Sequence, residues 1–197
     1  ALVVSSSMPV RDLETYALRI GGSCAVHANR GVNGIDGVTS TALGIARARG
    51  APTYLLTGDV AFLHDINALH IARSERVNLT IVVVNNNGGE IFGMLPIRNF
   101  DPVYTKHFTM PHNTDIAAVA AAFGIPHVKP GDGPAFEALI STPFAGTRVV
   151  EVPTDLDRSR EIRARIHSKV MDAVSPLFDA AVDCTTMASE TPELAWT

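Results

Sequence analysis

Short apolar runs that alternate with helical patterns are the feature that most restricts the fold of this 197-residue chain. Continuous apolar strands of this kind belong to a parallel sheet with both faces covered. We therefore predict an α/β fold, a doubly wound parallel sheet of about six strands with helices on both faces. The expected strands are residues 2–5, 24–28, 53–57, 79–85, 125–128 and 148–152, and the expected helices are residues 10–19, 37–49, 62–73, 115–123 and 135–142.

Composition excludes several classes of protein. Hydrophobic residues make up 46% of the chain and charged residues 18%, which excludes a disordered or fibrous protein. The net charge of −4 gives no basic excess, so we expect no nucleic-acid partner. No run approaches the roughly 18 apolar residues of a membrane span, and two cysteines are too few for a disulfide scaffold. We expect a cytoplasmic protein, and the apolar start without methionine suggests a piece of a longer one.

Two loops that follow apolar strands carry candidate ligands for a metal ion. Asp59 follows one strand and Asn86 follows the next, 27 positions later, which is the length of one helix plus one strand. Both side chains should therefore meet at the same edge of the sheet. With a backbone carbonyl of the glycine turn that follows, they would form a set of oxygen ligands that suits Mg²⁺, and the adjacent helix start could bind an anion. The alternative is that both segments are ordinary turns.

This spacing resembles the Gly-Asp-Gly…Asn-Asn motif of thiamine diphosphate-dependent enzymes, which holds the cofactor diphosphate through a divalent metal. The resemblance implies thiamine diphosphate with Mg²⁺ or Mn²⁺ as cofactors, and Asp59, Asn86 and the Gly88 carbonyl as metal ligands. Val60 stands in place of the third glycine of the motif, and Ala61 lacks a hydroxyl that some relatives offer the diphosphate. The expected cofactor contacts here are Gly58, Asp59, Val60, Ala61 and Asn86.

Three further segments, residues 5–12, 29–37 and 85–96, narrow the resemblance. Together they resemble the C-terminal, diphosphate-binding domain of the MenD family, the 2-succinyl-5-enolpyruvyl-6-hydroxy-3-cyclohexene-1-carboxylate (SEPHCHC) synthases of menaquinone biosynthesis. In that family the enzyme decarboxylates 2-oxoglutarate on the thiazolium carbon and adds the resulting carbanion equivalent to isochorismate. A domain of another carboligase, similar to acetolactate synthase, and a non-catalytic α/β binding module are the alternatives.

The resemblance assigns Arg11 and Arg30 to carboxylates of the substrate or intermediate, a role that suits planar, bidentate donors. A charge on a helix surface is the alternative for Arg11, and a salt bridge within a loop is the alternative for Arg30. None of the seven histidines forms a metal-ligand pattern, and we assign them no role.

Apolar residues near the cofactor are assigned in the same way. Ile35 is the expected prop beneath the cofactor, or else an ordinary core residue. Ile91 and Phe92 are expected against the cofactor or the substrate, or else as packed lid residues. Ser7 lies where the cofactor or substrate loop of the family runs, and Asp36 is either a helix N-cap or a ligand contact.

The domain organisation follows from the same resemblance. We expect a diphosphate- and metal-binding domain over residues 1–170 and a C-terminal helix and tail over residues 171–197, with helical patterns at 155–170 and 175–182. Residues 88–113 should form a packed or lid-like functional loop. In the family, the glutamate that activates the cofactor belongs to the N-terminal pyrimidine-binding domain of a partner subunit. We expect that domain and the central domain to be absent here, the isolated chain to be inactive, and the full-length protein to be a dimer or tetramer.

Overall fold

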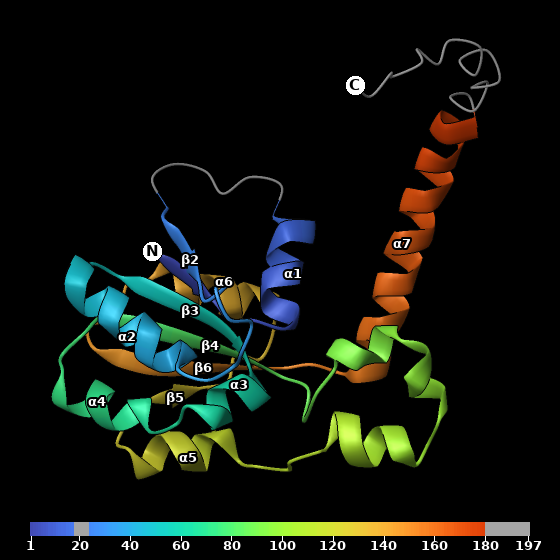
Figure 1. The fold of residues 1–197 in the computed structure, drawn as a ribbon. Helices are drawn as coiled ribbons and strands as arrows, with labels where there is room; N and C mark the ends of the chain where they lie inside the picture. Colours follow the sequence, from blue (N-terminus) through green and yellow to red (C-terminus); the bar gives the residue numbers. More distant parts are fainter. Residues whose placement is uncertain (18–23, 180–197) are drawn as a thin grey trace, which may run out of the picture. The chain divides into compact units, whose positions relative to one another are not determined.

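The computed structural model describes residues 1–17 and 24–179, and the chain divides into two compact units, Ala1–Thr154 and Asp155–Thr197. In the first unit, six parallel strands form one sheet in the order β2-β1-β3-β4-β6-β5 (Figure 1). This confirms the predicted α/β fold. The strands are β1 (Leu2–Val4), β2 (Val26–Ala28), β3 (Thr53–Gly58), β4 (Leu79–Asn85), β5 (His127–Val128) and β6 (Thr147–Pro153).

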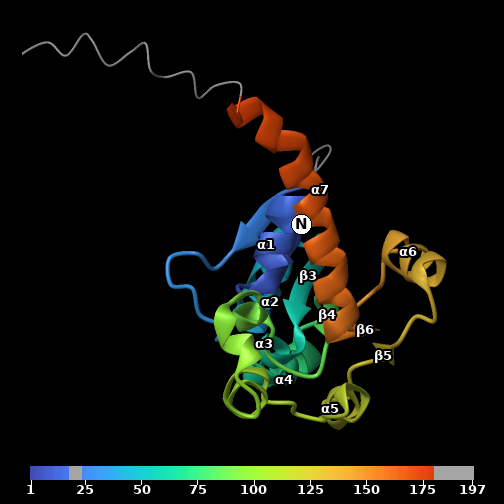
Figure 2. The ribbon, with the colours of Figure 1, turned by 90° about the vertical axis from the view of Figure 1, so that its right-hand side faces the viewer.

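Helices cover both faces of the sheet, as the right-handed connections between parallel strands require. The chain reverses its direction across the sheet after β2 and again after β5, so α1 and α6 lie on the face opposite α2, α4 and α5. Figure 2 shows α5 and α6 on opposite sides of β5. The helices of this unit are α1 (Met8–Tyr16), α2 (Val38–Arg49), α3 (Asp59–His64), α4 (Ala68–Ser74), α5 (Ile116–Ala122) and α6 (Gly133–Ser141).

The main core lies between the sheet and the face formed by α2, α4 and α5. Leu55 of β3 and Ile81 of β4 are fully buried there, together with Phe62 of α3 and Leu69 of α4. Burial of each such side chain contributes about 1.5–3 kcal/mol. A Leu55→Ala substitution in the middle of this layer would therefore cost about 2–5 kcal/mol, including the cavity it leaves.

The single helix expected over residues 62–73 is wrong: the segment forms two helices, α3 and α4, interrupted around Asp65. The carboxylate of Asp65 instead accepts hydrogen bonds from Ser40 at the start of α2, 2.7 Å from its N–H and 3.1 Å from its hydroxyl. The N-cap of α2 is Gly37, which has no side chain to supply this contact. Asp65 thus caps α2 from a distant position, and Asp36 is not the N-cap.

Arg148 of β6 anchors α6 to the sheet. Its side chain donates to the backbone carbonyls of Leu139 and Thr142 near the end of α6, over 2.8 and 3.2 Å, and to the Thr80 hydroxyl over 3.1 Å. The guanidinium also lies 4.9 Å from the centre of the Phe144 ring. Burial lowers the pKa of Arg148, and these acceptors satisfy the donors of the desolvated group.

The described part of the second unit is one helix, α7 (Leu156–Asp179). Asp155 caps its start, because its carboxylate accepts a hydrogen bond of 2.7 Å from the Arg158 N–H. The helix is continuous through residues 171–174, where the sequence predicts a break, and it includes Pro176. Residues 18–19 of the first expected helix, and residues 180–182 of the last, lie outside the described residues. No described helix has the length and apolar character that a membrane crossing requires.

Candidate functional site

The candidate site lies at the carboxyl edge of the sheet. The connection that leaves β1 runs to β2 on one side, and the connection that leaves the neighbouring strand β3 runs to β4 on the other side. Open α/β sheets bind ligands at such a switch point, beyond the carboxyl ends of the strands. Because all six strands are parallel, four of the loops that follow strands share this edge. They are residues 5–9, 29–37, 58–61 and 86–96.

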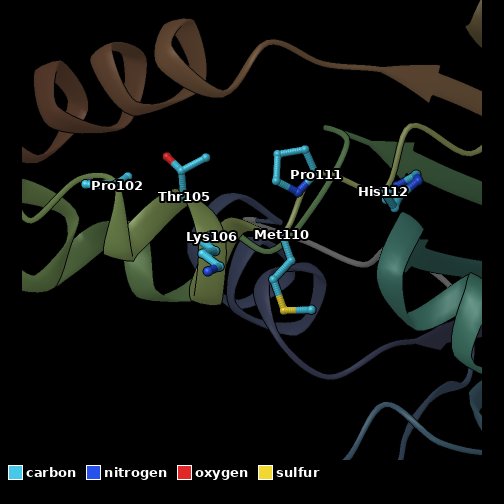
Figure 3. Close-up of a pocket in the computed structure, with 6 residues that line it drawn as sticks. All are labelled: Pro102, Thr105, Lys106, Met110, Pro111 and His112. Carbon is cyan, nitrogen blue, oxygen red and sulfur yellow. The ribbon is translucent and has the colours of Figure 1, made fainter.

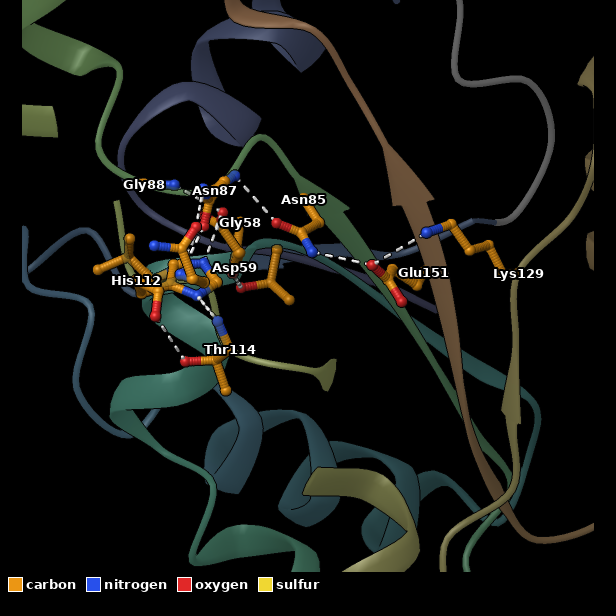
Figure 4. Close-up of polar contacts among 12 residues, drawn as sticks. Gly58, Asp59, Asn85, Asn87, Gly88, His112, Thr114, Lys129 and Glu151 are labelled. Atoms are coloured by element: carbon orange, nitrogen blue, oxygen red, sulfur yellow. Dashed lines mark hydrogen bonds and ion pairs between the residues drawn. The ribbon is translucent and has the colours of Figure 1, made fainter. Parts of the chain in front are cut away.

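Asp59 is the buried centre of the site, with 2% of its surface exposed. It is the first residue of α3, directly after β3. Its Oδ1 accepts from the Val60 N–H over 2.7 Å, and its Oδ2 accepts from the Gly88 N–H over 2.9 Å. Nε2 of His112 lies 3.1 Å from the same Oδ2 (Figure 4). Three protein donors thus fix the orientation of this carboxylate.

The amide of Asn86 lies against two other oxygen atoms. Its Oδ1 faces Asp59 Oδ2 and the Gly88 carbonyl, and with the amide reversed its nitrogen would donate to them over 3.2 and 2.7 Å. In either orientation of the amide, the end of the Asn86 side chain lies within hydrogen-bond distance of Asp59 Oδ2 and of the Gly88 carbonyl. A carboxylate has about four lone-pair positions, and the three donors to Asp59 leave about one for a cation or for the reversed amide. Asp59, Asn86 and Gly88 therefore fit a hard divalent cation.

The structure thus brings together all three residues predicted to hold a metal. Gly58, Val60 and Ala61 adjoin them along the chain, Val60 partly exposed and Ala61 buried. The described residues contain no group of three or more histidine, cysteine, aspartate or glutamate side chains that could hold a metal. Mg²⁺ takes about six oxygen ligands, so three protein oxygens would leave positions for water or for oxygen atoms of another molecule, such as a diphosphate.

Glycine is required at the loop after β4. Gly88 has φ of 150°, and a Cβ there would overlap the carbonyl oxygen of Thr109. A Cβ on Gly89 would lie 2.6 Å from the Phe108 carbonyl oxygen, and the Gly89 N–H donates to Thr109 over 2.7 Å. The π-helical turn η3 (Thr105–Thr109) therefore packs directly on the loop that carries Asn86.

Residues 88–113 form the packed segment that the sequence predicts. They contain two 3₁₀ turns, η1 (Ile91–Met94) and η2 (Pro96–Asn99), followed by η3. Phe92 lies edge-on to Phe108, 5.3 Å between ring centres, and Tyr104 stacks on the same ring. Phe92 is nevertheless 45% exposed. Both expectations for Phe92, a cofactor or substrate contact and a packed lid residue, are compatible with this position, and Ile91 precedes it half-buried.

An open pocket of about 540 Å³ lies beside this segment (Figure 3). One side of its lining is His112, which also contacts Asp59. From the sequence, no histidine is assigned a role. No local pattern marks His112, because it reaches Asp59 only through the fold of residues 88–113. The other lining residues are Pro102, Thr105, Lys106, Met110 and Pro111.

A second buried carboxylate lies behind the loop after β4. Glu151 of β6 accepts from Nδ2 of Asn85 over 2.8 Å, and its other oxygen lies 2.9 Å from Nε2 of His127. Lys129 Nζ is 3.8 Å away. The Oδ1 atom of Asn85 in turn accepts from the Asn87 N–H over 3.0 Å (Figure 4). This network links β5 and β6 to the loop of the candidate site.

The loop after β1 carries Ser7, and the helix that follows it, α1, carries Arg11. Ser7 has φ of 73°, a left-handed conformation that is uncommon for serine, and its carbonyl accepts from the Arg11 side chain over 2.7 Å. Arg11 is exposed on the first turn of α1. Arg11 therefore lies at the carboxyl edge of the sheet, and its guanidinium has no direct contact with Asp59.

The loop after β2 carries Arg30 and Ile35. Its start is fixed to its neighbours, because Ser6 donates to the Asn29 carbonyl over 3.3 Å and the Asn29 amide donates to Thr41 over 3.1 Å. Arg30 is exposed and forms no ion pair within the described parts of the chain, so the loop salt bridge considered above is absent there. Ile35 is half-buried.

Known proteins are similar to this chain in sequence and in fold. Residues 23–152 match the model of a family described as thiamine pyrophosphate enzyme, C-terminal TPP binding domain. A SEPHCHC synthase of Prosthecochloris aestuarii is 42% identical over 174 residues, which cover 87% of this chain and 30% of that protein. The Halobacterium salinarum synthase is 43% identical over 85% of this chain and 29% of its own length. The Thermosynechococcus vestitus synthase is 44% identical over 84% of this chain and 30% of its own length.

A solved structure agrees with these relatives. A protein of Mycobacterium smegmatis, assigned to the thiamin diphosphate-dependent enzymes, superposes with a TM-score of 0.61 at 27% identity. The match covers 79% of this chain and 28% of that one. The chain thus spans at most 30% of the length of the three synthases. The resemblance to the C-terminal domain of SEPHCHC synthases, predicted from the motifs, is confirmed.

Proposed function

Because the chain belongs to the thiamine pyrophosphate enzyme family, as its C-terminal TPP binding domain, we propose that it supplies the diphosphate- and metal-binding part of a SEPHCHC synthase active site. The reaction would be the decarboxylation of 2-oxoglutarate and the addition of the remaining four-carbon unit to isochorismate, in menaquinone biosynthesis. The observation that carries this proposal is the convergence of Asp59, Asn86 and the Gly88 carbonyl at one point. Identities of 42–44% to three synthases support it.

The role of Asp59 and Asn86 would be to hold Mg²⁺ or Mn²⁺, which in turn would bind the diphosphate of the cofactor. Thiamine diphosphate, held there, would supply a nucleophilic ring carbon for 2-oxo acids and a cationic ring able to take up the electron pair released by decarboxylation. Gly58, Val60 and Ala61 would line the diphosphate, and Ile35 and Ile91 would contact its rings. Ser7 would border the same site from the loop after β1.

Substrate recognition would depend on the exposed arginines. Both proposed substrates are polycarboxylates, and a guanidinium binds a carboxylate through two parallel hydrogen bonds. Arg11, on the first turn of α1, and Arg30, in the loop after β2, lie at the same sheet edge as Asp59, and Arg30 has no ion-pair partner within the described residues. Phe92, partly exposed beside these loops, would contact the apolar parts of substrate or cofactor.

We also propose that this chain alone does not turn over 2-oxoglutarate. In the family, the activating glutamate comes from the pyrimidine-binding domain of a partner subunit, and the full-length protein would be a homodimer or tetramer. Of the carboxylates near the site, Asp59 is committed to the metal loop and Glu151 to Asn85 and His127. Rapid CO₂ release from 2-oxoglutarate by the isolated chain would contradict this proposal.

Cofactor binding is the first test. Isothermal titration with thiamine diphosphate should give Mg²⁺-dependent binding to the wild-type chain. Binding should weaken more than about 100-fold in Asp59→Ala, because the buried carboxylate is the one anionic protein ligand of the proposed site. Asp65→Ala is the matched control for loss of an aspartate, because it removes the side chain that caps α2 but no candidate ligand. Equal binding by wild type and Asp59→Ala would contradict the assigned metal site.

The reaction can be tested in a chimaera in which this chain replaces the matching 174-residue segment of the Prosthecochloris aestuarii synthase. We expect product formation that requires both 2-oxoglutarate and isochorismate and is lost in Asp59→Ala. A chimaera that binds thiamine diphosphate but uses pyruvate would favour a carboligase similar to acetolactate synthase. One that binds the cofactor and forms no product from either substrate would favour a non-catalytic binding module.

A further inference from the structure

We propose that His112 is a positioning residue for Asp59, and that it holds the carboxylate in the orientation that receives the divalent cation. This inference rests on the proposed function of the Asp59 site. The two residues lie 53 positions apart, and Nε2 of His112 is 3.1 Å from Oδ2 of Asp59. Both side chains are largely shielded, with 15% of His112 and 3% of Asp59 exposed. An interaction between two groups removed from water is worth more than the same pair at the surface.

The hydrogen bonds of the ring define which nitrogen carries the proton. The Thr114 N–H donates to Nδ1 of His112 over 2.9 Å, so Nδ1 must present a lone pair. In the neutral ring the proton is then on Nε2, which points at Asp59. Thr114 therefore makes His112 a hydrogen-bond donor of fixed direction toward the carboxylate.

His112 differs from the other donors to Asp59. Val60 and Gly88 donate from backbone N–H groups, which any residue at those positions would provide. Asn86 reaches the same carboxylate but is itself a proposed metal ligand, whereas His112 is a side-chain partner of Asp59 outside the proposed ligand set. Partners of this kind, which contact a metal ligand but not the metal, typically contribute about 10–100-fold to metal affinity. Its loss would leave each oxygen of Asp59 with one backbone donor, so the carboxylate would be held less firmly.

The backbone around His112 is fixed independently of its ring. Thr109 accepts from the Gly89 N–H over 2.7 Å, and the Asn113 N–H donates to the Asn87 side chain over 2.7 Å. These bonds flank position 112 on both sides and remain when the imidazole is replaced. Substitution of His112 should therefore leave the segment in place and change only the contacts of the ring, which are those with Asp59 and with the Thr114 N–H.

The test compares substitutions that keep or remove a donor at the position of Nε2. Glutamine places its amide nitrogen near that position, whereas asparagine is one methylene shorter and phenylalanine fills the space without a donor. We would titrate Mn²⁺ into each variant at saturating thiamine diphosphate and follow free Mn²⁺ by electron paramagnetic resonance. His112→Phe and His112→Asn should bind Mn²⁺ about 10–100-fold more weakly, and His112→Gln within about 3-fold of wild type. His107→Phe, at an exposed position of the same segment, should bind as wild type.

Wild-type affinity in both His112→Phe and His112→Asn would overturn the inference while the proposed function stands. Absence of Mn²⁺ binding by the wild-type chain would count against the proposed function instead. The ring can then be tested without cofactor, by ¹⁵N spectra of the histidine side chains in wild type and Asp59→Ala. We expect His112 to be a single Nε2–H tautomer whose proton exchanges faster with water in Asp59→Ala. A mixture of tautomers, or exchange that does not change, would overturn the inference.

Discussion

Asn87 and Asn113 lie 26 positions apart in the sequence and are joined by two hydrogen bonds, one donated by each residue. Nδ2 of Asn87 donates to Oδ1 of Asn113 over 2.9 Å, and the Asn113 N–H donates to Oδ1 of Asn87 over 2.7 Å. Both residues have positive φ, 62° and 48°, which asparagine tolerates better than most residues. The pair therefore ties Asn113, at the end of the irregular segment, to the loop after β4 that carries Asn87. Asparagine suits both the backbone conformation and the side-chain contact at these two positions.

Glycine substitutions at these two positions should have unequal effects, although both keep the left-handed backbone accessible. Asn87→Gly removes both hydrogen bonds, while Asn113→Gly removes one, because its backbone N–H remains. We expect Asn87→Gly to lower the free energy of unfolding by about 0.5–1.5 kcal/mol more than Asn113→Gly. Urea denaturation of both variants measures this difference. Equal losses would show that the hydrogen bond from the Asn113 N–H to the Asn87 side chain adds nothing to stability.

Gly88→Ala should be strongly destabilising, because φ of 150° disfavours alanine and the new Cβ would overlap the Thr109 carbonyl. We expect a loss of about 2–4 kcal/mol in the free energy of unfolding. Gly44→Ala is the matched control: Gly44 lies inside α2, its Cβ would meet no other atom within 4 Å, and the same change should stabilise the chain. The expected gain there is about 0.5–1 kcal/mol. Thermal unfolding of the two variants should thus shift in opposite directions, and a neutral Gly88→Ala would contradict the packing described for η3.

Asn86→Asp should make stability depend on metal. The substitution places a second carboxylate oxygen about 3.2 Å from Asp59 Oδ2, where two like charges repel in a buried site. Without metal we expect unfolding at lower temperature than in wild type, by the equivalent of about 1–3 kcal/mol. Added Mg²⁺ should remove most of this difference, because the cation neutralises the repulsion. Asn86→Leu, similar in size but without a ligand atom, should show no such response to Mg²⁺. If Mg²⁺ stabilises both variants equally, the cation does not bind at this position.

Glu151→Gln should weaken the hydrogen bonds that link Glu151 to Asn85 and to His127, beside the loop after β4. Glu151 accepts from Asn85 and lies within hydrogen-bond distance of His127, and a glutamine amide would keep one acceptor oxygen and replace the other with an N–H donor. We expect a loss of about 1–3 kcal/mol, because the hydrogen bonds to a charged carboxylate are replaced by weaker neutral ones. Lys129→Ala, which removes an exposed partner 3.8 Å from the same carboxylate, should change stability by less than about 1 kcal/mol. Chemical denaturation separates these outcomes, and a larger effect of Lys129→Ala would reverse the assignment of the stabilising partners.

The strands were the most predictable part of the fold. β4, a continuous run from Leu79 to Asn85, has the predicted bounds, and the other strands differ from theirs by a few residues. The break between α3 and α4 could not be predicted, because its cause is the contact between Asp65 and Ser40 of another helix. Periodicity describes local preference, whereas this cap is a tertiary interaction.

The candidate site was predictable where spacing along two adjacent strands determines it. Asp59 and Asn86 follow β3 and β4, so their convergence depends only on strand order and length. His112 reaches the site through a segment of irregular turns, whose course no pattern in the sequence describes. The positions of Arg11 and Arg30 at the same edge follow from the strands that precede them.

The hydrogen bonds from Glu151 to Asn85 and from Asn85 to Asn87 reach the metal loop from the side opposite His112. Together with Asn113, they fix the loop within the fold before any ligand arrives. The loss of backbone entropy, about 1–2 kcal/mol for each residue ordered, is then met during folding and not during binding. A ligand that completes this site would thus meet a rigid receptor, and its affinity would be reduced little by the ordering of the loop.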